Sequence, residues 1–219
     1  PVAVESTSGE VVFTQEEILD GQLVWRSMGG HQLGSIWGHG AYVAPDWTAD
    51  WVHRESEIWL ELAAQSQFAK PFTQLTNFEQ AQLESMLRDD IRPNSYKSDT
   101  DVIIVSERRA KAIKSLQTYY SNLFGDNPDF QPLREQYAMK EGTIASAESR
   151  EMLSAFFFWG AWAAVTERPG ENYTYTNNWP FDPVVGNTPT SNNIVWSILS
   201  VVVLIAGVGA LAWYHASLK

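Results

Sequence analysis

The stretch IVWSILSVVVLIAGVGALAWY, residues 194–214, decides the architecture of this chain. Its 21 residues carry no charge, and at ~1.5 Å per residue a helix of this length spans about 30 Å, the hydrocarbon thickness of a bilayer. Trp196 stands near one end and Trp213 near the other, as in an aromatic belt. Because β-branched residues occupy every face, the run favours a membrane helix over a buried soluble helix. We therefore predict a transmembrane helix at residues 193–215.

The residues that flank this helix predict its orientation. No Lys or Arg stands between residues 169 and 193, whereas Lys219 follows the helix. The positive-inside rule then places residues 216–219 in the cytoplasm and the large domain, residues 1–168, outside. Residues 169–192 are rich in Asn, Pro, Thr and Tyr and are predicted to form an ordered linker that descends to the membrane.

Charge and cysteine content limit the function of the large domain. The chain has 219 residues, a net charge of −11 and no Lys/Arg cluster that could track phosphates, so nucleic acid is excluded as a partner. Arg108 and Arg109 stand in a helical stretch with Lys111 and Lys114 and are predicted to form a solvated helix face. The absence of cysteine excludes disulfides, thiol nucleophiles, Cys-ligated zinc and thioether-attached haem.

Capping residues and helical periodicity predict a mainly α domain. The predicted helix starts lie near Thr14, Asp46 or Thr48, Thr76, Ser106 and residue 146. The uncharged stretch from Leu153 to Val165 is too short to span a bilayer, so it is either a central core helix or a helix that packs on a membrane-embedded partner. Residues 1–10 are polar and predicted to be loose. Residues 102–105 form either a short strand or the start of the next helix.

The residues alone offer no catalytic constellation. The four histidines, His31, His39, His53 and His215, form no i,i+4 pair and no HExxH motif, so each is predicted to have a structural hydrogen-bonding role. No serine stands in a GxSxG elbow and no glycine loop matches a phosphate-binding motif. The carboxylates of Asp89 and Asp90 diverge on a helix. An enzyme with its own site in this domain is therefore the weakest interpretation.

Three long segments resemble one family. Residues 21–55 read GQLVWRSMGGHQLGSIWGHGAYVAPDWTADWVHRE, and residues 155–180 and 186–191 read AFFFWGAWAAVTERPGENYTYTNNWP and GNTPTS. These strings resemble the N-terminal extracytoplasmic region of single-chain, quinol-dependent nitric oxide reductases of bacteria, with residues 80–130 the least diagnostic part. The resemblance implies a cytochrome c-like domain with minor β structure that has lost its haem.

Two positions match the residues that would bind the haem in such a domain. In the resemblance, Ser27-Met28-Gly29-Gly30-His31 takes the place of the Cys-x-x-Cys-His attachment motif, and Met139 falls at the position of the distal ligand. With no cysteine, covalent haem is impossible, and the resemblance then implies that His31 and Met139 are vestigial ligand positions; a non-covalent haem held by these two residues is the less favoured alternative. Aromatic side chains are expected to fill the former haem pocket.

The loop Gly38-His39-Gly40-Ala41-Tyr42 carries a further implication. It resembles a Gly-x-Gly-Ala-Tyr segment whose tyrosine carbonyl ligates a calcium that also binds haem propionates of the catalytic part of the enzyme. Calcium accepts backbone carbonyls, and glycines let the backbone approach closely. We expect Tyr42 to supply its carbonyl to such a calcium, or to pack over the propionates; a plain loop turn is the alternative.

The resemblance also implies the activity of the parent enzyme, which reduces two NO to N2O and water. Electrons pass from membrane quinol through haem b to a haem b3/non-heme iron centre in a twelve-helix core of the haem-copper oxidase type, beyond residue 219. This chain would then be a non-catalytic part that packs over that core at the bacterial inner membrane and faces the periplasm. Whether the enzyme is a homodimer, and whether it serves denitrification or NO detoxification, stays open. The alternative is a stand-alone, membrane-anchored binding or redox-carrier domain.

Overall fold

Side-chain caps decide where most helices of this protein begin. Thr14 and Thr76 each accept a hydrogen bond from the backbone three residues later, and the glutamate at that position bonds back, which completes two capping boxes. Asp46 and Ser106 cap two further helices through the same type of side-chain bond. The helix starts predicted from these four residues are therefore confirmed.

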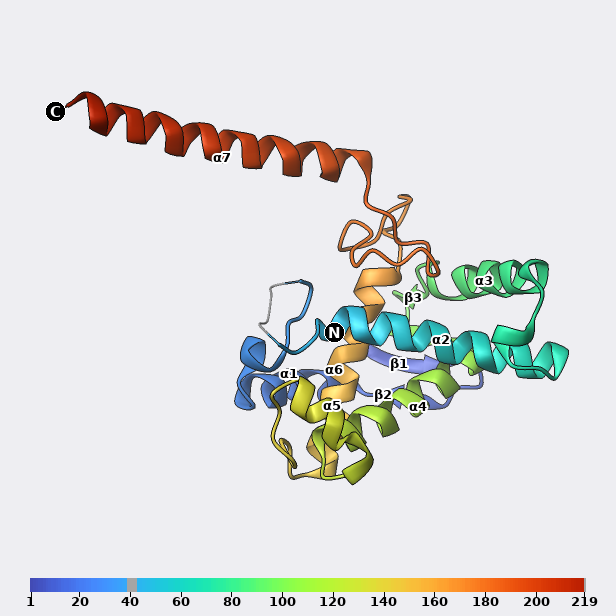
Figure 1. The fold of residues 1–219 in the computed structure, drawn as a ribbon. Helices are drawn as coiled ribbons and strands as arrows, with labels where there is room; N and C mark the ends of the chain where they lie inside the picture. The colour runs from blue at the N-terminus through green and yellow to red at the C-terminus, as the bar shows by residue number, and fades with distance from the viewer. Residues whose placement is uncertain (39–42, 219) are drawn as a thin grey trace.

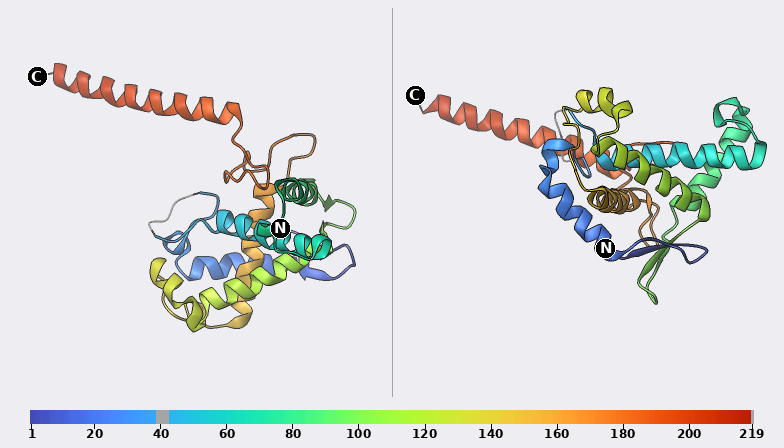
Figure 2. Two further views of the ribbon diagram at one scale, coloured as in Figure 1. Left: turned by 45° about the vertical axis from the view of Figure 1, so that its right-hand side comes forward. Right: turned by 90° about the horizontal axis from the view of Figure 1, so that it is seen from below.

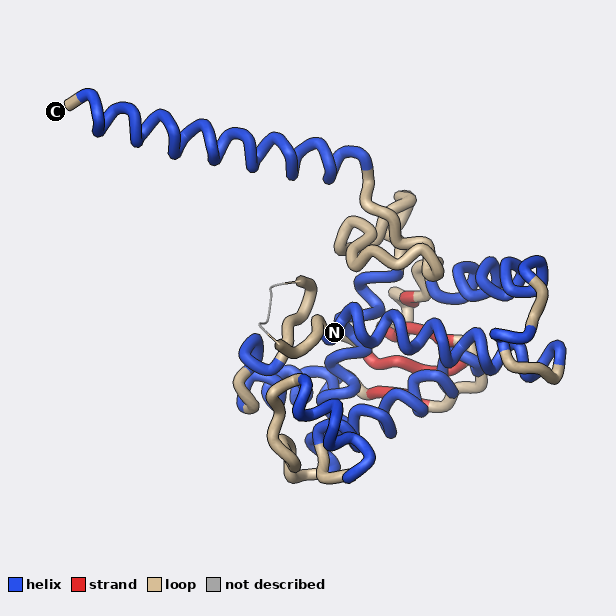
Figure 3. Tube along the Cα trace, viewed as in Figure 1, coloured by secondary structure: helices blue, strands red, loops and turns tan. Residues whose placement is uncertain are grey.

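The computed structural model describes residues 1–38 and 43–218 and shows a mainly helical domain with a small sheet and a long C-terminal helix (Figure 1; Figure 3). The α-helices are α1 (Gln15–Ser27), α2 (Trp47–Phe68), α3 (Asn77–Ile91), α4 (Glu107–Phe124), α5 (Gln131–Gln136), α6 (Ala147–Val165) and α7 (Ser191–Ser217). The strands are β1 (Ala3–Ser6), β2 (Val11–Phe13), β3 (Tyr96–Lys97) and β4 (Val102–Val105). Short 3-10 helices are η1 (Gly30–Leu33), η2 (Phe72–Gln74) and η3 (Pro128–Phe130).

The sheet joins segments that lie far apart in the sequence. Its strand order is β2-β1-β4-β3, with β1 parallel to β4 and the other pairs antiparallel. Ala3 pairs with Val102 and Ser6 with Val105. The prediction that residues 1–10 are loose is therefore wrong, because β4 supplies a partner that buries Val4 and Ser6 on one face of β1. Residues 102–105 are a strand, which decides between the two alternatives for that segment.

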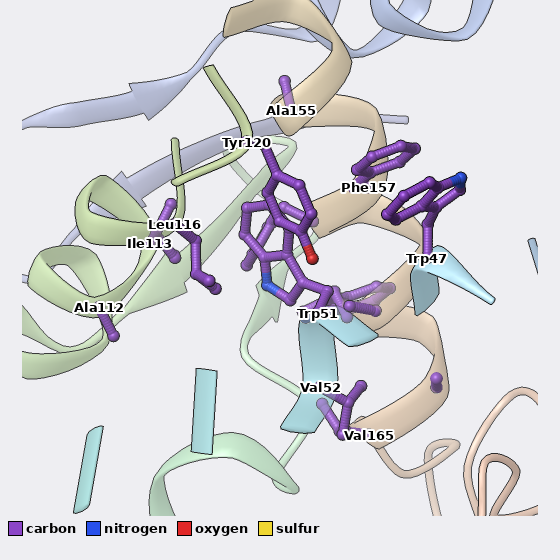
Figure 4. Packing of buried hydrophobic residues seen from close by; sticks show 14 of the residues in the cluster. Trp47, Trp51, Val52, Ala112, Ile113, Leu116, Tyr120, Ala155, Phe157 and Val165 are labelled. Carbon is purple, nitrogen blue, oxygen red and sulfur yellow. The ribbon is translucent and has the colours of Figure 1, made fainter. Parts of the chain in front are cut away.

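Helix α6 forms the centre of the domain. It packs on α1, α2 and α4, and Figure 2 shows it enclosed by other elements in both views. Its contact with α1 is close because Gly21 has no side chain: a Cβ there would lie 1.9 Å from the carbonyl oxygen of Met152. In Figure 4 the ring of Phe157 lies against that of Trp47, and Tyr120 lies beside Trp51. Residues 153–165 are thus a central core helix.

A buried ion pair crosses this core. The Arg109 Nε atom donates to a Glu55 carboxylate oxygen at 2.7 Å, and the other oxygen accepts the indole N–H of Trp51 at 3.0 Å. Both charged side chains are almost fully buried. The prediction of a solvated face is therefore wrong for Arg109, because Glu55 on α2 offers it a partner. Lys111 and Lys114 are exposed, as predicted, and Arg108 lies over the ring of Trp59.

Two arginines at the end of α3 hold the linker between α6 and α7. Arg92 donates to Glu167 at 2.8 Å and to the side chain of Asn187 at 3.0 Å, and Arg88 donates to the carbonyl of Val184 at 2.8 Å. Asn187 in turn donates to the carbonyl of Ala164 at 2.9 Å. These bonds join α3 and α6 to both side chains and backbone of the linker, so the segment is ordered without regular secondary structure.

Helix α7 leaves the linker and extends away from the domain (Figure 1). It begins at Ser191 because the side chain of Thr190 caps it. Within the described residues it is the helix long and apolar enough to cross a membrane, and none of its apolar window is buried against the domain.

Candidate functional site

The base of the loop that contains residues 38–42 is held closed by one carboxylate. An Asp46 oxygen accepts the backbone N–H of Gly38 at 2.6 Å and the hydroxyl of Ser35 at 2.7 Å. The other oxygen of Asp46 accepts the N–H of Ala49 and so caps α2. Backbone bonds from Ser35 to Pro45 and from Trp47 to Ser35 close the base further. The two ends of the loop are thereby joined to the start of α2.

Close packing surrounds this base. Gly34 has a φ of 120°, and a Cβ there would lie 2.0 Å from the indole nitrogen of Trp47, which donates to the carbonyl of Leu33 at 2.8 Å. A Cβ on Gly38 would lie 3.0 Å from the ring of Trp179 in the linker. The loop therefore starts beside the segment that leads into α7. Of the predicted loop residues, Gly38 is described, whereas His39, Gly40, Ala41 and Tyr42 lie outside the described residues, and so does the expected calcium ligand.

His31 and Met139, which the resemblance places at former haem-ligand positions, lie in different parts of the fold. His31 is in η1, and its ring meets that of Trp25 edge-on at 4.8 Å between centroids. Met139 is buried after α5, where its N–H donates to the carbonyl of Arg134 at 2.8 Å.

A series of aromatic rings connects His31 to the segment of Met139. Neighbouring rings in the series lie 4.8 to 6.4 Å apart between centroids. In order, the series contains His31, Trp25, Phe156, Phe157, Trp47 and Tyr137. Tyr137 stands two residues before Met139, so the series of rings ends in the segment that contains Met139.

Comparison with protein families identifies the domain. Residues 1–181 match the family model that describes the cytochrome c-like domain of NorB, a component of nitric oxide reductase. The chain belongs to this family. Among the curated proteins, none matches the chain. The match covers the whole folded domain and most of the linker, so the domain is that of a nitric oxide reductase, an oxidoreductase family.

The cytochrome c-like family description raises the question of a c-type haem, and the residues do not fit one. Thioether attachment needs cysteine, and the chain has none. The position next to His31 is occupied by the ring of Trp25, which is buried and packs on Phe156. The ring that packs on His31 is therefore a protein side chain.

The remaining titratable groups inside the domain serve its packing. Tyr120 donates to Asp50 at 2.8 Å, and Arg54 donates to the same oxygen at 2.9 Å. Burial, followed by the charge of Asp50, raises the pKa of Tyr120 well above its ordinary value. Burial by itself lowers the pKa of Arg54, but the hydrogen bond to Asp50, the charge of Asp50 and the neighbouring tyrosines together outweigh burial, and the pKa rises. Tyr120 thus stays protonated and Arg54 charged at neutral pH.

The histidines occupy separate environments. His53 lies 3.7 Å from Asp182 in the linker and 3.5 Å from Glu57 in the next turn of α2, and His215 contacts Tyr214 near the end of α7. Within residues 1–38 and 43–218, no three His, Asp or Glu side chains come close enough together to hold a metal ion. Asp89 is exposed, and Asp90 accepts from Trp59 and Ser106, so the two carboxylates serve different surroundings, as predicted.

Proposed function

We propose that this chain is the non-catalytic, extracytoplasmic part of a quinol-dependent nitric oxide reductase and that it packs over the haem-containing membrane core. The ring series between His31 and Met139 carries the proposal. A domain that lacks thioether cysteines, and whose aromatic rings pack from His31 to the segment of Met139, would offer electrons no route from a soluble cytochrome. A membrane quinol that delivers electrons directly to the core then replaces that route.

The proposal assigns the redox groups to other parts of the enzyme. Haem b, haem b3 and non-heme iron would be bound by the membrane core, which takes NO and quinol as substrates. The contribution of this chain is to cover the outer face of the core and to connect to it through α7.

The electron donor can be tested on the full-length reductase purified from membranes. We expect a pyridine haemochrome spectrum of b-type haem only, and NO reduction that runs with a reduced quinol but not with reduced cytochrome c. Covalent haem on the polypeptide, or turnover supported by cytochrome c, would contradict the proposal. The stand-alone carrier alternative instead requires a redox group on this chain alone.

We also propose that the large domain faces the periplasm of a bacterium and that α7 enters the inner membrane toward the cytoplasm. The absence of Lys and Arg from residues 169–193, together with Lys219 after the helix, supports this orientation. Because the chain lacks cysteine, single cysteines can report the topology. With Glu10→Cys, a membrane-impermeant maleimide should label intact spheroplasts; with Ser217→Cys it should label only permeabilised ones. The reverse pattern would overturn the orientation.

The loop from Gly38 to Tyr42 is proposed to lie at the haem propionates, with the Tyr42 carbonyl as a calcium ligand. The closed base at Asp46, joined to Gly38 and to α2, supports this because it holds both ends of the loop. Asp46→Asn removes the charge that accepts the Gly38 N–H. Metal analysis of the full-length enzyme should show loss of calcium in this variant and retention in Asp101→Asn. Equal calcium in both variants would refute the assignment.

A further inference from the structure

Two apolar pockets share a wall beside the linker. The smaller, of about 220 Å³, lies between α1 and α6, and the larger, of about 430 Å³, lies between α6, β4 and the linker. Trp37 and Trp159 line both pockets, and Trp162 and Tyr175 line the larger. We call the surface formed by these four side chains the aromatic groove. Among the described residues, no Asp, Glu, Lys or Arg lines either pocket, although the chain has a net charge of −11.

Trp37 is presented at this groove at a conformational cost. Its φ is +55°, in the left-handed region that bulky residues rarely adopt. The conformation is held by bonds from its indole N–H to the carbonyl of Gly160 at 3.0 Å and from its backbone N–H to Thr48 at 3.2 Å. The side chain is nevertheless 44% exposed. Bonds to α2 and α6 therefore fix the ring at the surface, where almost half of it stays open to contact from outside this domain.

The other three side chains of the groove, Trp159, Trp162 and Tyr175, form a flat stack of rings. Trp159 and Trp162 stack at 5.4 Å between centroids, and Trp162 and Tyr175 at 5.7 Å. The indole N–H of Trp162 is buried and has no hydrogen-bond partner in the part of the chain that the structure describes. Large apolar and aromatic surfaces with a few polar groups are typical of protein interfaces.

The position and chemistry of the groove select its occupant. Tyr175 belongs to the linker that continues into α7, so the groove lies next to the segment that enters the bilayer. Lipid headgroups attract Lys and Arg, which the described lining of the groove lacks. A second copy of the domain would bring another charge of −11. The outer ends of membrane-spanning helices are rich in Trp and Tyr, so they offer an aromatic, largely uncharged surface that suits the groove.

We propose that the aromatic groove is the surface on which this domain docks onto the membrane-embedded helices of its own reductase. This rests on the proposed function, which requires such a core, and adds the side of the domain that contacts it. Trp37 contacts the outer ends of those helices, and Tyr175 contacts them near the entry of α7.

Photo-crosslinking in the full-length reductase tests the proposal in its native membrane. Benzoylphenylalanine replaces Trp37 in one variant and Tyr175 in a second, and Phe78 serves as the control because it is 79% exposed on α3. We expect mass spectrometry to find crosslinks from positions 37 and 175 to peptides of the membrane-spanning helices, and none of these crosslinks from position 78. Adducts to lipid alone, crosslinks between copies of this domain, or equal crosslinking at position 78 would overturn the proposal.

The same samples separate this proposal from the proposed function. NO reduction with quinol is measured before irradiation in the unsubstituted reductase, which decides the assignment, and in each variant. Activity without crosslinks to the membrane helices would refute the groove and leave the reductase assignment standing. Crosslinks to those helices in an enzyme that lacks quinol-driven NO reduction would support the groove and refute the assignment.

Discussion

Replacing Glu55 by glutamine will leave a charged guanidinium in the core without its counter-ion. Glu55 and Arg109 are almost fully buried, with their bonded atoms 2.7 Å apart, and the remaining carboxylate oxygen accepts the indole N–H of Trp51. A second guanidinium nitrogen of Arg109 has no hydrogen-bond partner among the described residues. The carboxylate charge is therefore the main compensation for burying this arginine.

The expected loss follows from the burial of the pair. Removing one partner of a buried ion pair costs about 3–5 kcal/mol of unfolding free energy, which for a domain of this size lowers Tm by roughly 6–20 °C. The double variant Glu55→Met with Arg109→Met should recover most of this loss, because no isolated charge remains. Recovery should fall short by ~1–3 kcal/mol, because the Trp51 indole then lacks an acceptor.

Urea denaturation of the chain in detergent micelles, followed by tryptophan fluorescence, measures these differences. The matched control is Glu84→Gln, which breaks a 3.0 Å pair with Arg88 in which both side chains are about one-third exposed. A pair this exposed contributes ~0–1 kcal/mol. If Glu55→Gln and Glu84→Gln reduce the unfolding free energy equally, or if the double variant is less stable than the single one, the reasoning is wrong.

Three further changes test the loop base, the linker and the core network. Gly34→Ala should cost clearly more unfolding free energy than Gly9→Ala, which costs ~1–2 kcal/mol. Both glycines have positive φ, but of the two only Gly34 would bring its new Cβ into a clash, 2.0 Å from an indole nitrogen. Equal urea midpoints for the two variants would contradict this. Arg92→Lys should speed proteolysis of the linker, because lysine cannot reproduce the arginine bonds to Glu167 and Asn187; unchanged cleavage by limited digestion would exclude that role. Because the pKa of Tyr120 is raised in the folded state, stability should fall as pH rises above about 10, the unfolded value, and Tyr120→Phe should flatten that fall in urea titrations at pH 8–11.

Local signals in the sequence predicted the helices well. A capping residue such as Thr14 or Thr76 bonds to backbone three residues away, so its effect can be read from neighbouring letters. The charge-free run that became α7 is equally local. Strand β1 was missed because its partner β4 lies about a hundred residues further along the chain, and polar residues 1–10 carry no sign of it.

The candidate site, too, could be predicted from the sequence only in part. Resemblance pointed to His31, Met139 and the loop from Gly38, and the family match agrees with the domain type. It did not point to Asp46 as the residue that closes the loop base, although its place before a helix is a cap signal. No pattern in the sequence predicts the left-handed backbone and exposed ring of Trp37, because both depend on contacts with Gly160 and Thr48 in other elements.

By itself, the sequence determined what depends on composition and near neighbours: a membrane-length apolar helix, the caps that start the helices, and the absence of cysteine that excludes thioether haem. Only the tertiary structure decided what depends on distant partners. Arg109 is a core residue because Glu55 lies across from it, and the rings between His31 and Met139 are in contact because η1, α1, α2 and α6 fold around one another. Burial and ring contact are properties of the assembled fold, since each needs atoms that the chain brings together from far apart.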